Sequence, residues 1–281
     1  MNVLVAPDSF KGSLSAKAVA DHIEFGILQA YPSAKIDKLP LADGGEGTVD
    51  ALVYACNGKK ISKMVTGPLG EQLNAHFGLL GGKTAVIEIA AASGLEHISP
   101  GDENPLKATT FGTGELIKAV LDEDIDTVII GLGGSATTDA GMGMAQALGV
   151  SFKDEAGHEL GFGGAELLRL ATIDLSGLDR RIEKVKFIVA SDVTNPLYGK
   201  NGAAHVFGPQ KGATPELVRL LDDSLRNFAK VVQDHLGFDV NEISGAGAAG
   251  GLGAALSIFC NAKPESGIDI VLDYANFNQH L

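Results

Sequence analysis

The feature that most constrains this chain is a repeated order of a short apolar run, a loop rich in glycine and acidic residues, and a segment with apolar residues at helical spacing. The apolar run 2–6 is followed by helical spacing over 16–30, and the run 35–41 is followed by a predicted helix over 48–55. Short apolar runs are typical of buried parallel strands, which are joined by crossover helices. The order therefore predicts an α/β fold with a mainly parallel sheet.

The sequence pattern changes near residue 61. Three predicted strands over 63–66, 72–80 and 84–90 are separated by Gly-Pro and Gly-Gly turns, with little helix between them. This change predicts a domain boundary near residue 62. The alternation then resumes, with predicted helices over 112–121, 141–148, 215–236, 246–259 and 269–280 and predicted strands over 126–130 and 186–190.

Charge and composition exclude several classes of protein. Lys and Arg number 22 and Asp and Glu number 35, so the net charge is 22 minus 35, or −13, and no basic block offsets it. This balance argues against nucleic acids and anionic membranes as partners. No apolar segment reaches membrane-spanning length, and the N-terminus lacks the pattern of a secretory signal. Cys56 and Cys260 lie far apart and in no CxxC motif, which predicts a reducing, cytoplasmic location.

Four loops share one layout, in which a predicted strand ends and small residues then surround acidic or hydroxyl groups. They are 7–13, 42–48, 131–139 and 190–196. Turn and capping preferences explain any single loop of this kind. Together the four favour one ligand crevice, because the carboxyl ends of parallel strands meet at one edge of a sheet. Their glycines would let the backbone approach a phosphate.

The acidic residues of these loops suit phosphoryl transfer, which needs Mg²⁺ and an oriented hydroxyl group. They are Asp8, Asp43, Glu46, Asp139 and Asp192. Lys11 follows the first strand, where it could stabilise a transferring phosphate, grip a carboxylate, or be a solvated surface lysine. Lys211 is a weaker candidate for the same roles. The seven histidines form no metal-binding motif.

Three glycine motifs suggest other nucleotide sites. Residues 82–84 resemble the end of a P-loop, but the earlier glycine is missing and a strand follows. The segment 131–136 fits GxGxxA after a strand, and Asp154 lies about twenty residues further on, so a dinucleotide site is an alternative. The segment 245–250 matches GxGxxG without a preceding strand, which favours close helix packing or an anion site at a helix start.

Five segments together resemble the bacterial glycerate kinase family. They are APDSFKGSLSA at 6–16, PLADGGEGT at 40–48, GLGGSATTDAGMG at 131–143, ASDVTNPLYG at 190–199 and FGPQKGA at 207–213. The resemblance implies two unlike α/β domains, one flavodoxin-like with a parallel sheet and one with a mixed sheet, the second inserted in the sequence of the first. We expect residues 1–62 with 258–281 in one domain, 63–257 in the other, and the active site between them. The implied reaction is ATP-dependent phosphorylation of D-glycerate to 2-phosphoglycerate with Mg²⁺.

The resemblance also implies residue roles. Asp192 would accept the proton of the substrate hydroxyl, Lys11 would hold the glycerate carboxylate or the transferring phosphate, and Asp8 would complete the catalytic group. The implied substrate-binding residues are Ser9, Asp43, Gly44, Gly45 and Glu46, the implied ATP-binding residues are Gly133, Gly134, Ser135 and Thr137, and the implied Mg²⁺ ligand is Asp139.

One departure from the family concerns the C-terminus. Members of the family continue beyond the position of Leu281, so we expect the first domain to lack later strands and its exposed edge to favour association, as in a homo-oligomer. Three hypotheses for function follow: an active glycerate kinase, an NAD-dependent dehydrogenase built on the loop 131–136, and a truncated, non-catalytic form of the kinase.

Overall fold

A computed structural model of the chain describes residues 1–280, and its centre is a six-stranded mixed sheet. The strands are Lys59–Thr66 (β3), Gln72–Leu80 (β4), Thr84–Glu88 (β5), Thr127–Gly131 (β6), Lys186–Ala190 (β9) and Lys263–Glu265 (β10). Their order is β10-β9-β6-β5-β4-β3. The first four pair in parallel, whereas β4 is antiparallel to both β5 and β3.

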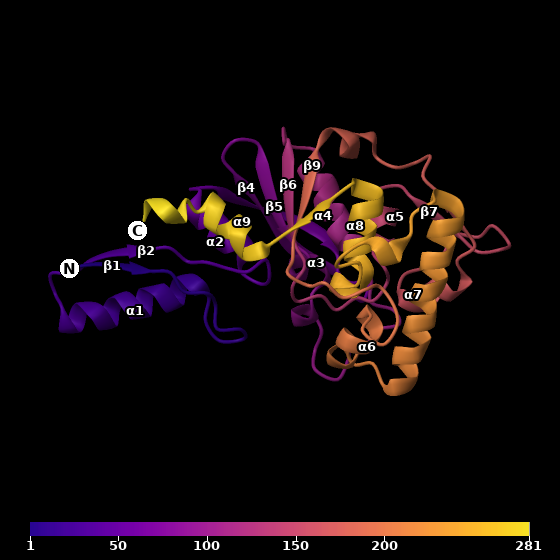
Figure 1. The fold of residues 1–281 in the computed structure, drawn as a ribbon, viewed down its shortest axis with the longest axis horizontal. Helices are drawn as coiled ribbons and strands as arrows, with labels where there is room; N and C mark the ends of the chain where they lie inside the picture. The colour runs from indigo at the N-terminus through magenta and orange to yellow at the C-terminus, as the bar shows by residue number, and fades with distance from the viewer. Residues whose placement is uncertain (281) are drawn as a thin grey trace.

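The central strands are buried on both faces, as their continuous apolar runs predict. Successive residues of a strand point to opposite faces, so neighbours on β6 enter different cores. Ile130 packs with residues of Phe111–Leu121 (α4), Met142–Ala147 (α5) and Leu252–Cys260 (α8), whereas Ile129 packs with Thr48–Ala55 (α2) and Gly267–Tyr274 (α9). Figure 1 shows these two groups of helices on opposite sides of the sheet.

Smaller elements surround this core. The remaining helices are Ala16–Ala30 (α1), Ala90–Ser93 (α3), Ala203–Phe207 (α6) and Pro215–Leu236 (α7). Ser151–Lys153 (β7) and Thr172–Asp174 (β8) form an antiparallel pair of their own. The long helix α7 begins at Pro215 after the capping residue Thr214 and ends at Leu236, before Gly237 with its φ of 74°. Both ends therefore match the predicted helix over 215–236.

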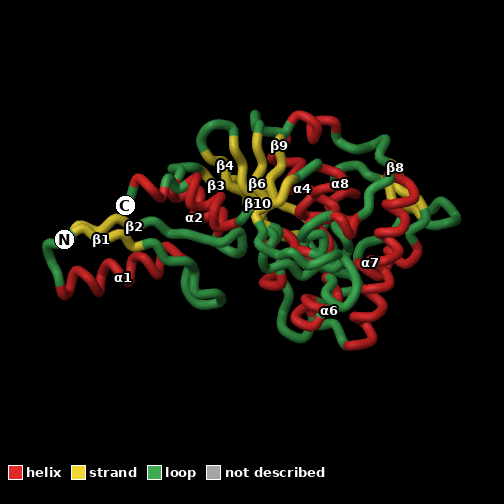
Figure 2. Tube along the Cα trace, in the orientation of Figure 1, coloured by secondary structure: helices red, strands yellow, loops and turns green. Residues whose placement is uncertain are grey.

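The N-terminal strands form a separate small unit with α1. Asn2–Val5 (β1) and Lys35–Lys38 (β2) pair in parallel, and α1 connects them. The side chain of Ser15 caps α1 by accepting a hydrogen bond from the Ala18 amide at 3.2 Å. Lys38 of β2 pairs with Asp21 and Glu24 of α1 at 2.7 and 2.5 Å, so these charges orient the helix on the strand pair. Figures 1 and 2 show this small unit projecting from the larger body.

The α/β class is confirmed, and the central elements match their predicted positions, but the expected division at residue 62 falls inside β3. The helix α2 packs against β4 and β5, and α9 packs against α2 and β9. Residues 48–55 and 263–274 therefore belong to the larger body. We propose to place the division in the loop 39–47, with the unit 1–38 as the first body.

The predicted helix over 246–259 is only partly correct. Regular α-helix begins at Leu252, because Ala249, Gly250 and Gly251 have left-handed backbone conformations with φ of 50°, 68° and 100°. The predicted helix over 269–280 likewise ends early, at Tyr274.

No helix within residues 1–280 is both long enough and apolar enough to cross a membrane. Large apolar side chains on α1 are exposed, among them Phe25 at 67% and Ile23 at 40%. The association expected from the sequence stays a prediction.

Candidate active site

The four loops singled out in the sequence meet in one cleft of about 510 Å³. The loops after β1 and β2 come from the small unit, and those after β6 and β9 come from the central sheet. The predicted site residues that line the cleft are Asp8, Ser9, Lys11, Asp43, Gly44, Gly45, Glu46, Gly133, Gly134 and Asp192. Strands separated by long stretches of sequence thus bring ten of the thirteen predicted residues together, as the strand-end argument predicts.

Backbone-to-backbone contacts hold the second and third loops against each other. A Cβ added at Gly131 would lie 2.5 Å from the carbonyl oxygen of Gly44, and one at Gly133 would lie 2.5 Å from the Cα of Gly45. Gly44 has a φ of 95°, and an added Cβ would lie 2.8 Å from the carbonyl oxygen of Ala190. No larger residue fits at these contacts, so the cleft has a wall of bare backbone.

The carboxylates of the cleft are exposed and only lightly constrained. Asp8 accepts a hydrogen bond from the Ser9 amide at 2.5 Å, and Asp43 accepts one from the Gly45 amide at 3.0 Å, each through Oδ1. Asp192 follows β9 in a loop where Ser191 Oγ accepts from the Val193 amide at 3.3 Å. These carboxylates can still bind a cation or accept a proton.

Lys11 is the lysine of this cleft, and within residues 1–280 it forms no ion pair with a carboxylate. By contrast, Lys38 in the same unit pairs with two carboxylates. An exposed, unpaired ammonium beside several acidic groups can meet an anionic ligand without first breaking an ion pair. This placement favours the ligand-binding interpretation of Lys11 over the solvated surface lysine.

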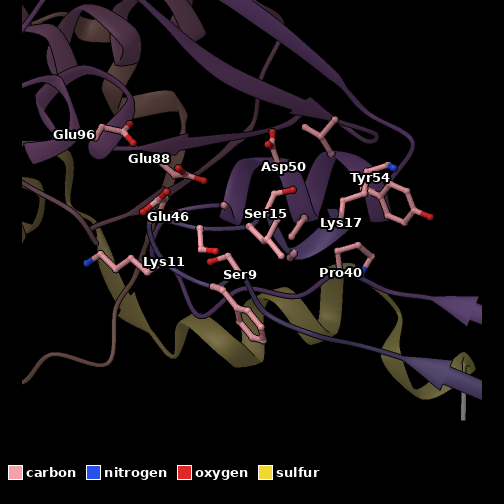
Figure 3. Close-up of a pocket in the computed structure, with 18 of the residues that line it drawn as sticks. Ser9, Lys11, Ser15, Lys17, Pro40, Glu46, Asp50, Tyr54, Glu88 and Glu96 are labelled. Carbon is pink, nitrogen blue, oxygen red and sulfur yellow. The ribbon is translucent and has the colours of Figure 1, made fainter. Parts of the chain in front are cut away.

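A second cavity of about 670 Å³ adjoins the cleft and shares Ser9, Lys11 and Glu46 with it. It runs between the small unit and α2, and Figure 3 shows Lys11 and Tyr54 at opposite ends of it. Apolar groups such as Tyr54 line its far end. The cleft and this adjoining cavity together offer space for a ligand larger than glycerate.

Glu88 faces this second cavity and was not predicted from the sequence. It lies at the end of β5, is 7% exposed, and accepts a hydrogen bond from the Val49 amide at 2.5 Å and another from the Gly47 amide. Burial, aided by the nearby charges of Asp50 and Glu96, raises its pKa to about 7 against the effect of these amides. The sequence signal was a lone acid ending the apolar run 84–87, at the same strand end as the loops.

Three predicted residues lie behind the cleft rather than in it: Ser135, Thr137 and Asp139. Asp139 is completely buried, and its carboxylate accepts hydrogen bonds from the amide and hydroxyl of Thr110 at 2.8 and 2.9 Å and from the amides of Gly141 and Gly143 at 3.1 and 3.2 Å. Burial raises the pKa of Asp139 above its ordinary value, and these hydrogen-bond donors offset only part of that effect. A carboxylate so enclosed joins the loop to α4 and α5, and this placement does not fit a metal ligand facing the cleft.

Ala248 and Ala249 line the cleft and were also missed. They lie in the glycine-rich segment that the sequence assigned to helix packing or an anion site. A Cβ added at Gly250 would lie 1.9 Å from the carbonyl oxygen of Thr137, so the segment turns back onto the loop 131–139. Close packing is therefore observed at this segment, which also forms a wall of the cleft, and the anion site stays a prediction.

The dinucleotide alternative does not fit the structure. Asp154 follows β7, which pairs with β8 in a separate sheet and not with β6. Its carboxylate accepts hydrogen bonds from Arg169 at 2.7 Å and from the His158 amide at 2.9 Å. A dinucleotide fold needs this acid at the end of the strand beside the glycine loop, facing the ribose.

Comparisons with known proteins identify the family of the chain. A sequence profile described as the glycerate kinase family matches residues 3–281. A glycerate kinase of Bacillus subtilis is 54% identical over 99% of this chain and 73% of its own length. A glycerate 2-kinase of Escherichia coli is 50% identical over 100% of this chain and 74% of its own length.

A solved structure leads to the same family. The crystal structure assigned to glycerate kinase 2 of Salmonella typhimurium LT2 has a TM-score of 0.91 and 52% identity, and the match covers 100% of this chain and 75% of that one. Because the profile covers nearly the whole chain and relatives at about half identity match it over almost all of its residues, this chain belongs to the glycerate kinase family and is a kinase.

Proposed function

We propose that the chain transfers the terminal phosphoryl group of ATP to the 2-hydroxyl of D-glycerate and so forms 2-phosphoglycerate and ADP. The observation that carries this proposal is the meeting of the four loops in one cleft, with carboxylates, one unpaired lysine and a bare-backbone wall. The name of the E. coli relative, glycerate 2-kinase, supports the 2-position.

The position of each cleft residue suggests its role in phosphoryl transfer. Asp192 accepts the proton of the attacking hydroxyl, because it is an exposed carboxylate at the cleft side of β9. Lys11 faces the negative charge of the glycerate carboxylate or the transferring phosphate. Gly133 and Gly134 present backbone to the phosphates, where side chains would keep the ligand away. Transfer of this kind depends mostly on positioning and charge.

The residues of the cleft fit Mg²⁺. Within the described part of the chain, no three His, Cys, Asp or Glu side chains form a ready-made metal site. Mg²⁺ in kinases usually takes about one or two carboxylates and completes its shell with phosphates and water, so such a cluster is not needed. Asp8 and Asp43 would hold the ion, which when bound would neutralise charge on the phosphates. This assignment replaces the one expected for the buried Asp139.

The decisive experiment identifies the product. The chain is incubated with ATP, Mg²⁺ and D-glycerate, ADP is measured, and the position of the new phosphate ester is read by ³¹P and ¹³C NMR. We expect ADP only when all three are present, and a phosphate on carbon 2. A phosphate on carbon 3 would overturn the regiochemistry, whereas nucleotide binding without turnover would favour the non-catalytic alternative.

The Asp192→Asn variant tests the assigned base in the same assay. We expect kcat to fall by about 10² to 10⁴, the range for loss of a general base, with little change in the KM for ATP. Asp223→Asn is the matched control, because Asp223 is an exposed aspartate on α7 outside the cleft. Wild-type turnover by Asp192→Asn would refute the assignment.

We also propose a cytoplasmic location, because both cysteines are free. Fractionation of the native host would test it.

A further inference from the structure

Lys211 is a buried cation that the proposed chemistry does not yet use. It ends the short 3₁₀ helix Pro209–Lys211 and is 2% exposed. Its Nζ donates hydrogen bonds to Ser135 Oγ at 2.9 Å and to the Thr137 carbonyl oxygen at 2.6 Å. Within residues 1–280 no carboxylate accepts a hydrogen bond from this ammonium, and Asp139 is the nearby charge that favours it.

A lysine in this position is costly if its only task is to fill space. Burying an ammonium without a paired carboxylate is unfavourable, and burial lowers the pKa of Lys211 to about 7. An apolar side chain of similar length would fill the same volume without this cost. The presence of an amine at this buried position therefore indicates that its hydrogen bonds or its charge have a functional role.

The two acceptors of Lys211 belong to the stretch that continues the cleft wall. Gly133 and Gly134 line the cleft, and Ser135 and Thr137 follow directly behind them. The other side of this stretch is fixed by the backbone, since Leu95 N donates to the Gly134 carbonyl at 2.9 Å. Lys211 thus holds the stretch 133–137 from the interior side, opposite the backbone contact of Leu95.

The same contact reaches a second wall. The Thr137 carbonyl that accepts from Lys211 is also the atom against which Gly250 packs, and Ala249 beside Gly250 lines the cleft. One amine therefore fixes the point where the walls formed by 133–137 and 248–250 meet.

The charge of Lys211 also lies where it can attract the phosphates of the ligand. Four acidic side chains line the cleft (Asp8, Asp43, Glu46 and Asp192), and Lys11 faces them. When it is protonated, the amine behind the wall of 133–137 adds positive potential toward the phosphates without neutralising these acids, because it is enclosed and not in contact with them.

We propose that Lys211 is a positioning residue that holds the wall 133–137 in the form that binds the phosphates of the phosphoryl donor, and that it supports them with a buried positive charge. The proposal rests on the proposed function for the identity of the donor, ATP.

Equilibrium binding separates the two proposals. The dissociation constant of the full chain for Mg²⁺ and AMPPNP, a non-hydrolysable ATP analogue, is measured by calorimetry for wild type, Lys211→Met and Lys200→Met. Lys200 is an exposed lysine outside the cleft and serves as the matched control. We expect Lys211→Met to bind at least about tenfold more weakly, the scale on which supporting residues act. Lys200→Met should stay within about twofold of wild type.

Steady-state kinetics then distinguishes positioning from a general loss of structure. For Lys211→Met we expect a raised KM for ATP and an unchanged KM for D-glycerate. Ser135→Ala removes one acceptor and leaves the amine in place, so it should shift the KM for ATP in the same direction by a smaller factor. This milder variant keeps the proposal testable if Lys211→Met does not fold.

Three results would overturn the proposal. They are unchanged analogue binding by Lys211→Met, an equal rise of the KM values for ATP and D-glycerate in Lys211→Met, and the absence of nucleotide binding by wild type. Binding by wild type that weakens in Lys211→Met, with no glycerate turnover in either, would support this inference while refuting the proposed function.

Discussion

Glu88 shows at the scale of one residue how the fold sets a titration near neutral pH. Its carboxyl group is enclosed at the end of β5 and caps the start of α2, directly after the loop 42–47. Burial dominates over the two amide donors, so the protonated form is favoured up to about pH 7. The ordinary pKa of a glutamate is 4.5. Between pH 4.5 and about pH 7, Glu88 is therefore ionised in the unfolded chain but protonated in the folded one, and this difference opposes folding.

The linkage gives a signed prediction for stability. A folded-state pKa raised to about 7 means that the folded chain binds this proton more tightly than the unfolded chain. The stabilising contribution is complete below the unfolded value of 4.5 and is lost as pH rises through about 7. We expect the free energy of unfolding of wild type, relative to Glu88→Gln, to fall by at most about 3 kcal/mol over this range.

Urea unfolding of both proteins across this pH range measures the effect. The difference between the two curves isolates Glu88 from other titrating groups, including Asp50 and Glu96, which face it. A difference that does not depend on pH would show that the pKa of Glu88 is the same in the folded and unfolded chain and that burial does not raise it.

Some site residues could be predicted from the sequence and others could not, for a geometric reason. Asp8 and Asp192 lie in the loops that follow strands revealed by the apolar pattern, so their place at the strand ends follows from topology. Asp139 belongs to a loop that folds back under α4, and spacing along a loop does not tell which side faces the ligand. Glu88 was missed because a lone acid that ends an apolar run is equally typical of an ordinary strand end.

At the scale of elements, the turn 43–46 is the joint between the small unit and the sheet. The amide of Gly45 binds Asp43, and Gly44 has a left-handed backbone against Ala190. The glycine-rich segment 245–251 supports the opposite wall in the same way. Its alanines and glycines fit a helical pattern, and contacts with the loops 137–140 and 193–196 override that local preference.

Gly44→Ala tests this joint. The substitution combines a left-handed conformation with a Cβ 2.8 Å from the Ala190 carbonyl, so we expect a loss of stability and a larger loss of turnover. Gly70→Ala is the matched control, because Gly70 has the same φ of 95° and nothing within 4 Å of an added Cβ. The control isolates the backbone strain, which costs about 1 to 3 kcal/mol.

The difference between the two variants measures the contact with β9. Thermal unfolding gives the stability of both proteins, and the kinase assay gives their activity. If Gly44→Ala and Gly70→Ala lose the same stability and keep the same activity, the close approach of the turn to Ala190 has no role in the site.

At the scale of the whole molecule, the cleft joins two bodies of unequal size. Within residues 1–280, the small unit reaches the larger body through the loop 39–47 and through a contact of 2.6 Å between His280 Nδ1 and Asp37 Oδ2. The sequence could not reveal this division, because α2 and α9 alternate with strands like any other helix. The apolar faces of α2 and α9 pack against the larger sheet. Such a long-range contact cannot be predicted from periodicity along the chain.

Because the cleft takes side chains from both bodies, a bound ligand should protect both at once. We expect Mg²⁺ with AMPPNP and D-glycerate to slow amide hydrogen exchange in 8–13 of the small unit and in 132–135 of the sheet, while 59–64 of the edge strand β3, which line neither the cleft nor the adjoining cavity, are unchanged. In Lys11→Met, protection of 8–13 should decrease and that of 132–135 should remain, since Lys11 links the small unit to the anionic ligand. Protection confined to one body would mean that ligands bind without bridging the cleft, and catalysis by residues from both units would then lose its structural basis.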